Sequence, residues 1–453
     1  MTGMQYGFDD TIAACATPPG EGGVAIVRVS GPGAEGAMRR FFSNCPGSIE
    51  SHRLYFGYIV NAGEREEALC VLMRAPRSYT REDVCEFQIH GGEATVARLL
   101  RALYAAGIRP AGPGEFTRRA FMNGRVDLSR AEAVMDVLRA RGEAALRAGL
   151  RELDGGVARS VNAARSEMAG MLAEAGAALD FPDEIEQTEI EDGLRDRVRA
   201  LRARLERECA VRAGDMLRRG LSAVLCGRPN VGKSSLMNAL LGSERAIVTR
   251  TAGTTRDVLT EEMELGGYRV RLSDTAGQRD TADEIERMGV ERARAALKSA
   301  DMVLMVLDAS CPLTDEDEAL LSEADERYIL VLNKSDLPGG ADCEELRARF
   351  AGRECAVSAR SGAGVEELRR LMSARVAAEA RPDAVFLRER HIDCVRRACG
   401  LLEAAAQSLD SGASIELAAL DLEGALNALG EITGETADTD VINRIFTDFC
   451  VGK

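Results

Sequence analysis

The sequence predicts a multidomain protein that combines α/β domains with an all-α domain. Its 453 residues are enough for two or three domains, each with a buried core. Residues 1–122 and 220–375 contain strand-like apolar runs between helical patterns. Residues 123–219 and 376–453 are rich in Ala, Leu, Arg and Glu with helical periodicity, and only 4% of the chain is aromatic. We therefore predict four segments in the order α/β, helical, α/β, helical.

The order of these segments suggests that one domain interrupts another. Breaks at Gly155-Gly156 and at Pro182 divide the first helical segment into several helices. Because helical segments lie on both sides of residues 220–375, we expect a single helical domain into which that α/β domain is inserted.

A phosphate-binding loop opens the second α/β domain. Residues 227–234 (GRPNVGKS) fit the pattern G-x-x-x-x-G-K-[ST] and follow an apolar run, 222–226, that is typical of a buried strand. Backbone N–H groups of such a loop converge on a phosphate, and the next helix adds the positive end of its dipole. We expect Lys233 to neutralise the β- and γ-phosphates and the Ser234 hydroxyl to hold Mg²⁺. A chance glycine-rich turn is the alternative, and the motifs that follow argue against it.

The next two motifs are expected to hold the γ-phosphate and Mg²⁺. Asp274-Thr275-Ala276-Gly277 closes a strand-like run, 268–272, which places Asp274 in the Mg²⁺ shell and the Gly277 N–H near the γ-phosphate. Thr255, in the segment 253–257 (GTTRD), can cap Mg²⁺ and sense the γ-phosphate when a switch segment orders. A Ser/Thr-rich surface turn is the alternative for Thr255, but its position between the loop and Asp274 disfavours it.

The last two motifs select guanine. Asn333-Lys334-Ser335-Asp336 ends a strand-like run, 328–332, and a carboxylate at Asp336 can accept both N1–H and the exocyclic amine of guanine, whereas adenine has the wrong donor pattern. Ser358-Ala359 completes the base pocket through backbone N–H groups. The set predicts a Ras-like P-loop GTPase domain. Its expected GTP contacts are Asn230, Val231, Gly232, Lys233, Ser234, Ser235, Thr249, Thr254, Thr255, Asp274, Thr275, Ala276, Gly277, Asn333, Lys334, Asp336, Ser358 and Ala359.

Net charge and residue counts argue against several classes of ligand and partner. A net charge of −15 argues against broad, non-specific binding of nucleic acid, and the local cluster of Arg118, Arg119, Arg125 and Arg130 is more typical of a solvated helix face. Twelve cysteines without a C-x-x-C pair, together with three histidines, predict no zinc site. Neither a signal peptide nor a long apolar span is evident, so we expect a cytoplasmic protein with reduced thiols and no membrane contact.

Several further segments carry a resemblance to a known family. They are 10–20 (DTIAACATPPG), 79–84 (YTREDV), 90–92 (HGG), 113–117 (PGEFT), 127–133 (DLSRAEA), 432–435 (ITGE) and 444–453 (RIFTDFCVGK). The last segment ends in Cys-x-Gly-Lys, and this ending after an inserted GTPase domain is highly specific to one protein family. Over essentially its whole length the chain resembles the MnmE (TrmE) family of tRNA-modification GTPases.

The resemblance implies a homodimer formed through residues 1–122, which bind a tetrahydrofolate derivative (a 5-formyl or methylene form) as one-carbon donor. It also implies a heterotetramer with the FAD protein MnmG that installs a carboxymethylaminomethyl or aminomethyl group at C5 of the wobble uridine of certain tRNAs. The family's folate contacts fall on Arg28, Glu86, Arg125 and Lys453. A pteridine needs a carboxylate at its amidine edge, and a glutamate tail needs cations. Without the resemblance, each of the four is an ordinary surface or ion-pair residue.

The resemblance also implies a K⁺ ion against the phosphates. Its ligands are expected from Asn230, Thr249, Thr251 and Thr254. A fixed cation there stabilises the charge that develops between the β- and γ-phosphates, as an arginine finger does in other GTPases. From the residues alone, Asn230 is equally a plain turn residue after Pro229. Two nucleotide domains are expected to close face to face across their switches, so that hydrolysis drives a movement.

Two residues in the expected catalytic set leave alternatives open. Gln278, after Asp274–Gly277, is a departure from the family, whose residue there is apolar, and in Ras-like enzymes a glutamine at this position orients water. The family assigns that task to a glutamate that corresponds to Glu286, and Gln278 is then a bystander or a second contributor. Cys450 is expected to be needed for modification, with its chemical role open; it could also be an inert tail thiol, and Gly452 and Lys453 fit a prenylation box poorly.

Two other functional classes compete with this prediction. A ribosome-assembly GTPase of the Era or Der kind also carries P-N-V-G-K-S and G-T-T-R-D, but it should add a KH-type RNA module or a second nucleotide domain. Neither is evident in the sequence. A folate-dependent aminomethyl- or formyltransferase without GTPase activity would leave the phosphate-binding loop unexplained.

Substitutions at Gln278 and Glu286 separate the two catalytic assignments. We expect Glu286→Ala to lose most of the GTPase activity and Gln278→Leu to lose little, because the segment 283–289 follows the family at the glutamate. Single-turnover GTP hydrolysis in K⁺ buffer is the measurement. The reverse pattern would assign the water-orienting role to Gln278.

Overall fold

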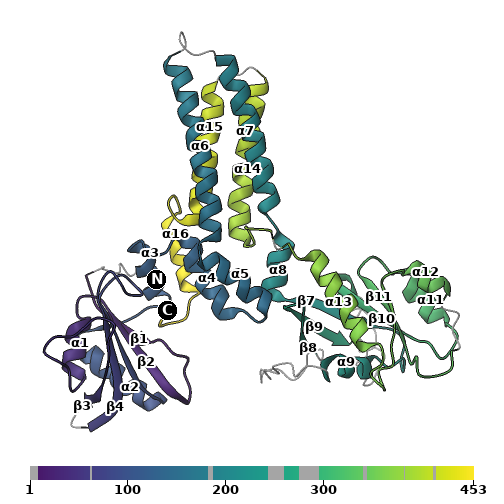
Figure 1. The fold of residues 1–453 in the computed structure, drawn as a ribbon, viewed down its shortest axis with the longest axis horizontal. Coiled ribbons are helices and arrows are strands. Elements are labelled where there is room, and N and C mark those ends of the chain that lie inside the picture. Colours follow the sequence, from purple (N-terminus) through teal and green to yellow (C-terminus); the bar gives the residue numbers. More distant parts are fainter. Residues whose placement is uncertain are drawn as a thin grey trace, which may run out of the picture. The chain divides into compact units, whose positions relative to one another are not determined.

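The computed structural model describes residues 9–61, 64–181, 187–242, 260–274, 295–339, 344–381, 383–411 and 415–453. The chain divides into two compact units. The first comprises Met1–Met135, Arg151–Ala203 and Cys394–Lys453, and the second comprises Asp136–Leu150 and Arg204–Asp393. Both contain a six-stranded sheet, and the first also contains a bundle of long helices (Figure 1). The predicted mixture of α/β domains with much helix is therefore present.

The sheet of the first unit has the strand order β3-β4-β5-β2-β1-β6. Its strands pair antiparallel, except that β1 and β6 are parallel. The strands are β1 (Ile12–Cys15), β2 (Gly22–Ser30), β3 (Leu54–Asn61), β4 (Glu64–Met73), β5 (Val84–Gly91) and β6 (Arg109–Pro110). Alternate residues, such as Val27, Leu72 and Phe87, face one core, where they meet Met38 and Leu99 of two helices. Those helices, α1 (Ala34–Phe41) and α2 (Glu93–Ala105), cover this face of the sheet.

The C-terminal tail packs into the N-terminal part of the same unit. Helices α3 (Glu115–Met122), α4 (Leu128–Arg139) and α16 (Thr439–Thr447) share a small core that contains Phe446 and Phe449. Beyond α16, the backbone N–H of Gly114 donates to the Cys450 carbonyl at 3.3 Å, and that of Phe116 to the Lys453 carbonyl at 3.2 Å. The last residues of the chain therefore pack with α3 and α4 of the N-terminal part.

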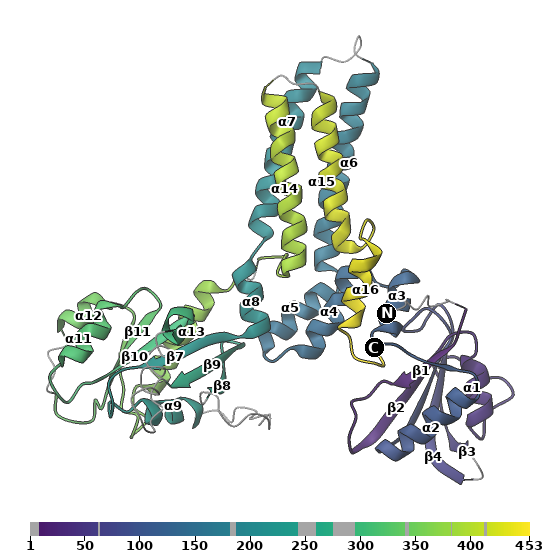
Figure 2. The ribbon, with the colours of Figure 1, turned by 180° about the vertical axis from the view of Figure 1, so that it is seen from behind.

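Four long helices form the bundle of the first unit. They are α6 (Gly156–Asp180), α7 (Gln187–Glu208), α14 (Glu389–Asp410) and α15 (Ile415–Thr433), and they run side by side in both views (Figures 1 and 2). Each contributes a buried apolar stripe, with Met168 on α6, Val198 on α7, Leu402 on α14 and Leu422 on α15. Two of these helices precede the second sheet in the chain and two follow it.

The second sheet has the order β12-β11-β10-β7-β9-β8 and is parallel except for β8. Its strands are β7 (Leu221–Cys226), β8 (Thr260–Leu265), β9 (Tyr268–Asp274), β10 (Met302–Asp308), β11 (Tyr328–Asn333) and β12 (Glu354–Ala356). The strands β10 and β11 are almost entirely buried, because alternate residues enter two separate cores: Leu304 packs with Leu236 and Leu368, whereas Val303 packs with Leu321 and Leu346.

Helices cover both faces of this sheet. Those that carry the core residues are α9 (Lys233–Gly242), α11 (Asp315–Ser322), α12 (Glu344–Arg349) and α13 (Val365–Glu379). Helix α8 (Val211–Arg219) precedes β7, and α5 (Glu143–Leu153) contacts the β8–β9 turn, where the Ala144 N–H donates to the Gly267 carbonyl at 2.9 Å. Among the helices that are described, none is long and apolar enough to cross a membrane.

Gly452 is the position on which docking of the tail depends most closely. Its φ of 99° lies in the left-handed region, and a Cβ there would stand 2.1 Å from the Cys15 carbonyl oxygen. We expect Gly452→Ala to release the tail, at a cost of about 1–3 kcal/mol for the strained backbone, and to make the last residues accessible to carboxypeptidase. The measurement is mass spectrometry of a timed digest.

Gly400→Ala is the matched control, because Gly400 lies in α14 with nothing within 4 Å of the added Cβ. It should leave the tail protected and stabilise the helix by up to about 1 kcal/mol. A protected tail in Gly452→Ala would contradict the docking described above.

Candidate functional site

The phosphate-binding loop connects β7 to α9 in a conformation that requires its glycines. Gly227 and Gly232 have φ values of 142° and 98°, and a Cβ on Gly232 would lie 2.3 Å from the Asn333 amide nitrogen. Asn230 is also left-handed, with φ 64°, and is exposed. The buried Lys233 ammonium donates to the carbonyl oxygens of Gly227 at 2.7 Å and Arg228 at 2.9 Å. The loop therefore curls around the lysine that is predicted to meet the phosphates.

Two of the predicted Mg²⁺-binding groups meet at the start of α9. The Ser234 hydroxyl donates to a carboxylate oxygen of Asp274 at 2.9 Å. Ser234 lies in the first turn of α9, and the buried Asp274 ends β9. A hydroxyl and a carboxylate oxygen are ligands that Mg²⁺ prefers, and the ion usually takes few protein ligands beside phosphates. The pair fits a Mg²⁺–nucleotide complex.

Asn333 joins the phosphate-binding loop to the predicted base pocket. Its side-chain amide donates to the Val231 carbonyl at 2.7 Å, and its amide oxygen accepts from the Ala359 N–H at 3.0 Å. Asp336 is exposed, and a hydrogen bond from the Ser358 side chain lowers the pKa of its carboxyl group. At neutral pH the carboxylate is therefore ionised and can accept two N–H groups.

Lys334, between these two residues, is held by Asp308 at the end of β10. The two side chains form an ion pair of 2.6 Å. Burial alone would raise the pKa of Asp308, but hydrogen bonds from Lys334 and Ser310 outweigh it and lower the pKa to about 2. The motifs thus meet at the carboxyl ends of neighbouring parallel strands, where open α/β sheets bind ligands.

Part of the predicted nucleotide site lies outside the described residues. This holds for the switch threonines, for most of the Asp274–Gly277 motif and for both candidate catalytic residues, namely Thr249, Thr251, Thr254, Thr255, Thr275, Ala276, Gly277, Gln278 and Glu286.

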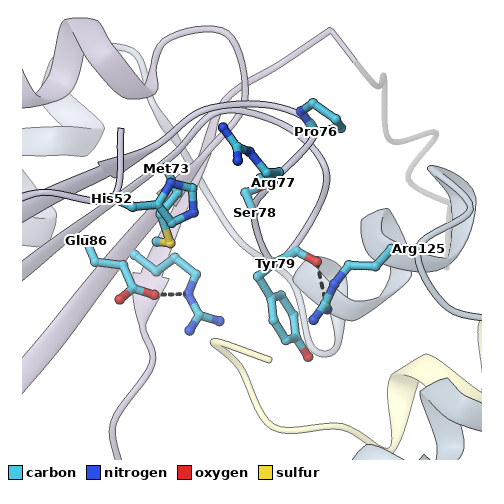
Figure 3. Close-up of a pocket in the computed structure, with 9 residues that line it drawn as sticks. His52, Met73, Pro76, Arg77, Ser78, Tyr79, Glu86 and Arg125 are labelled. Atoms are coloured by element: carbon cyan, nitrogen blue, oxygen red, sulfur yellow. Dashed lines mark hydrogen bonds and ion pairs between the residues drawn. The ribbon is translucent and has the colours of Figure 1, made fainter. Parts of the chain in front are cut away.

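A second pocket, of about 510 Å³, lies in the N-terminal domain (Figure 3). Its lining residues are Arg28, His52, Met73, Pro76, Arg77, Ser78, Tyr79, Glu86 and Arg125. Three of the four residues predicted to contact folate are among them. Arg28 on β2 lies directly opposite Glu86 on β5, and the two form an ion pair of 2.8 Å with side chains that are only 13% and 15% exposed. Glu86 therefore keeps a carboxylate at the less exposed part of the pocket.

Tyr79 forms a wall of this pocket between two arginines. The guanidinium carbons of Arg28 and Arg125 both lie 4.9 Å from its ring centroid, which is a cation–π distance. Arg125 also donates to the Tyr79 carbonyl at 3.0 Å, and the Tyr79 hydroxyl bonds that of Thr117 at 2.9 Å. Sequence reasoning included Tyr79 only within the YTREDV segment and gave it no role. Its place between the predicted cations appears only in the fold.

The docked tail brings Lys453, the fourth predicted contact, next to the pocket. An Arg28 N–H donates to the Gly452 carbonyl at 3.5 Å. Burial of Lys453 and the nearby positive charge of Arg28 lower the pKa of the lysine. Cys450, three residues earlier, is exposed, and its carbonyl accepts from the Gly114 N–H.

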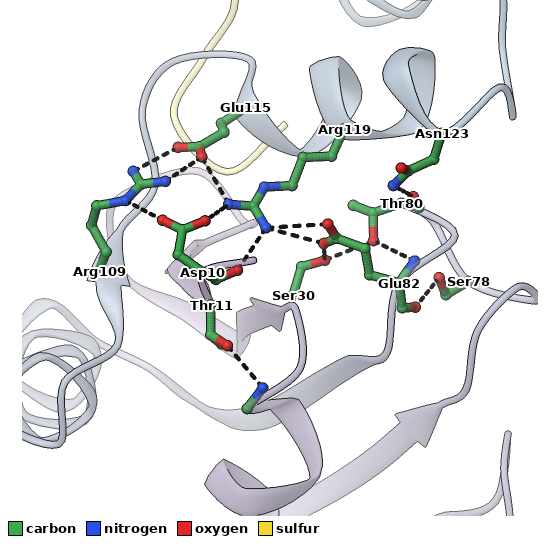
Figure 4. Close-up of polar contacts among 11 residues, drawn as sticks. Asp10, Thr11, Ser30, Ser78, Thr80, Glu82, Arg109, Glu115, Arg119 and Asn123 are labelled. Carbon is green, nitrogen blue, oxygen red and sulfur yellow. Dashed lines mark hydrogen bonds and ion pairs between the residues drawn. The ribbon is translucent and has the colours of Figure 1, made fainter. Parts of the chain in front are cut away.

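A buried charge network holds the loop that carries Tyr79 (Figure 4). Arg119 of α3, only 2% exposed, bonds the carboxylates of Asp10, Glu82 and Glu115. Burial acts to raise the pKa of Asp10 and of Glu115, but hydrogen bonds from arginines, Arg109 above all, outweigh it and lower both. The side chain of Asn123 donates to the Thr80 carbonyl at 2.7 Å. These contacts therefore hold Thr80 and Glu82, which closely follow Tyr79 in the same loop.

Together, the phosphate-binding loop, the Ser234–Asp274 pair and the base-binding segments define a P-loop GTPase that also carries an N-terminal ligand pocket. Family models described as the MnmE helical domain and the GTP-binding protein TrmE N-terminus match residues 128–450 and 11–125. Proteins named tRNA modification GTPase MnmE from Chloroflexus aurantiacus and Geobacter sulfurreducens are 47% and 44% identical over 98% of this chain, and the matches cover 100% and 99% of those proteins. The chain belongs to the MnmE family of tRNA modification GTPases, and it is a GTP hydrolase.

The similarity to Era covers a much smaller part of the chain than the similarity to the MnmE proteins. A solved structure of Era in complex with MgGDPNP and nucleotides 1506–1542 of 16S ribosomal RNA is 27% identical, with a TM-score of 0.28. The match covers 34% of this chain and 56% of that one, so it supports no assignment of function to the whole chain.

Asp336→Asn is predicted to change the preferred base. The side chain of asparagine has only one acceptor oxygen, so it cannot accept hydrogen bonds from both N1–H and the exocyclic amine of guanine. Its N–H group can instead donate to the carbonyl that xanthine carries at the carbon of that amine. We expect GDP affinity to fall by about a hundredfold or more, as two charge-assisted hydrogen bonds at about 1.5–3 kcal/mol each suggest, and XDP affinity to rise.

Titration with fluorescent GDP and XDP measures both changes. Asp315→Asn, at an exposed position in the first turn of α11, is the control and should change neither affinity by more than about twofold. Unchanged GDP affinity in Asp336→Asn would remove this residue from the base pocket.

Proposed function

We propose that this GTPase acts with the FAD-dependent protein MnmG to install a carboxymethylaminomethyl or aminomethyl group at C5 of the wobble uridine of certain tRNAs, using a tetrahydrofolate one-carbon unit. The observation that carries the proposal is the presence, in one chain of the MnmE family, of a GTPase site and a second pocket lined by a carboxylate, an aromatic ring and several cations. A GTPase of the Era or Der kind has no need of the second pocket.

The chemistry of the pocket fits a reduced folate. Glu86 can accept hydrogen bonds from the amidine edge of a pteridine, and its carboxylate is paired with Arg28. Tyr79 offers an aromatic surface, and the exposed Arg125 supplies positive charge for the glutamate end, while Lys453 adds positive charge beside Glu86. When bound, the folate supplies the one-carbon unit. The protein groups bind and orient it, and Cys450, exposed on the docked tail, is proposed as a functional residue whose chemistry the modification assay must define.

In the nucleotide site, Lys233 and the loop N–H groups are proposed to bind the β- and γ-phosphates, and Ser234 and Asp274 to hold Mg²⁺. Asn230 is proposed as a K⁺ ligand. Its exposed side chain, presented from a left-handed position in the loop, supports this assignment. The ion supplies positive charge beside the β–γ bridge, where charge develops during hydrolysis. Glu286 is proposed to orient the attacking water.

A homodimer through the N-terminal domain is supported by exposed apolar side chains on the face of its sheet opposite α1 and α2. Leu54, Phe56 and Val60 alternate along the edge strand β3 and are 49%, 59% and 40% exposed, and Val24 on β2 is 58% exposed. Helices α1 and α2 pack on the opposite face. Exposed apolar side chains gathered on one face are typical of an interaction surface.

The domain arrangement is proposed to be a GTPase domain, about 220–375, inserted into a helical domain made of 123–219 and 376–453, after an N-terminal domain of 1–122. The chain order of the four bundle helices, two before and two after the second sheet, supports it. With this connection, movement of the GTPase domain during hydrolysis can be transmitted through both connecting segments.

Wobble-uridine analysis tests the proposal. In cells that lack this protein, mass spectrometry of digested tRNA should show loss of the C5-modified uridine, and the wild-type gene should restore it. Glu86→Gln should fail to restore it and should bind 5-formyltetrahydrofolate about tenfold or more weakly, because the charged acceptor is lost, while GTP hydrolysis changes by less than about twofold.

Glu67→Gln is the control, since Glu67 is exposed on β4 and does not line the pocket. It should restore the modification fully. Unchanged tRNA in the deletion strain would refute the proposal, and a defect confined to ribosome assembly would favour the Era-like alternative.

A further inference from the structure

Arg77 is a cation of the N-terminal pocket that the proposed folate contacts do not use. It lines the pocket from the loop between β4 and β5, and Figure 3 shows it on the loop above Met73 and His52 in that view. The residue is exposed, and its guanidinium has no hydrogen bond or ion pair with any of the residues described. A charged residue that lines a pocket and has no polar partner among the described residues is available to a ligand.

The other cations of the pocket have partners within the protein. Arg28 is paired with Glu86, and Arg125 donates to the Tyr79 carbonyl and lies over the Tyr79 ring. Lys453 is partly buried near Arg28 and Glu86. Four cationic side chains thus lie in or beside the pocket, whereas Glu86 is the one acidic side chain among its lining residues. This excess of positive charge indicates a ligand with several negative charges.

The exposure of the lining residues gives the pocket a direction. Arg28 and Glu86 lie at its less exposed part, whereas His52, Pro76, Arg77 and Arg125 are exposed around its edge. A ligand that places a ring system against Glu86 therefore leaves its flexible end near solvent, where the cations are Arg77 and Arg125. In a folate that end is the glutamate, and each additional γ-linked glutamate adds one carboxylate.

We propose that Arg77 is a specificity-determining residue that binds the outer carboxylates of a polyglutamylated folate. A planar guanidinium matches a carboxylate with two parallel hydrogen bonds, so arginine suits this task better than a point charge. The inference rests on the proposed folate function of the same pocket. It adds that the natural ligand carries more than one glutamate.

Binding of two ligands that differ only in tail length tests the inference. Isothermal titration calorimetry of the full-length protein with 5-formyltetrahydrofolate is carried out with the monoglutamate and with the triglutamate. We expect the wild type to bind the triglutamate about fivefold more tightly, a modest factor because Arg77 is exposed and exposed ion pairs are worth little. In Arg77→Gln the ratio should fall below about twofold, with monoglutamate affinity nearly unchanged.

Arg40→Gln is the matched control, because Arg40 is an exposed arginine of α1 that does not line the pocket, and its substitution changes the net charge equally. It should keep the wild-type ratio. The ratio should also approach one in 0.5 M salt for the wild type, since salt screens exposed charges.

The outcomes separate this inference from the folate proposal. If neither folate binds the wild type, both fail. If the monoglutamate binds and tail length has the same effect in wild type and Arg77→Gln, the inference alone is overturned. Weaker binding of tRNA to Arg77→Gln with unchanged folate ratios would also overturn it and would assign Arg77 to the nucleic acid.

Discussion

The arrangement of the N-terminal domain depends on one buried positive charge. Arg119 is almost completely shielded from water, and an isolated guanidinium in that position would carry a desolvation cost of several kcal/mol. Asp10, Glu82 and Glu115 satisfy it, together with the Asp10 carbonyl, and these groups come from the start of β1, the loop before β5 and α3. Because removing one partner of such a network costs about 3–5 kcal/mol, these segments are held in one arrangement.

That arrangement makes the docking of the C-terminal tail possible. The network fixes α3, and the first turn of α3 offers the backbone N–H groups of Gly114 and Phe116 to the tail. A side chain at position 114 would clash with the Phe446 carbonyl and the Phe449 ring, so this close packing requires glycine. The tail then ends beside Arg28 and Glu86, so a segment that contains Gly452, 424 positions after Arg28, completes the surroundings of the pocket. The same network also positions the loop of Tyr79 and Arg77.

The GTPase site is assembled by a different constraint, the close approach of backbone segments at the ends of parallel strands. Gly232 has to be glycine because the Asn333 amide occupies the space of a Cβ, and Asn333 in turn holds Val231 and Ala359. A single buried side chain therefore links the phosphate-binding loop to the base pocket. The two sites are built differently: backbone carbonyls of the phosphate-binding loop hold a lysine, whereas the N-terminal pocket is lined by paired side chains.

The sequence by itself predicted the motifs of the nucleotide site and the strands that carry them. Local motifs with fixed spacing, such as 227–234 and 333–336, specify their own loop geometry next to strands that periodicity also reveals, and β7, β9 and β11 lie where the apolar runs predict them. The residues predicted to contact folate could be named only by resemblance, because Arg28, Glu86, Arg125 and Lys453 are far apart in the chain and each is ordinary in its local pattern. Only the tertiary structure decided that Arg28 and Glu86 are cross-strand partners, that Tyr79 lies between two arginines, and that Arg77 lines the pocket with no side-chain hydrogen bond or ion pair among the described residues. The physical reason is that pairing register, burial and the docking of the tail are properties of the packed chain and leave no periodic signal in the sequence.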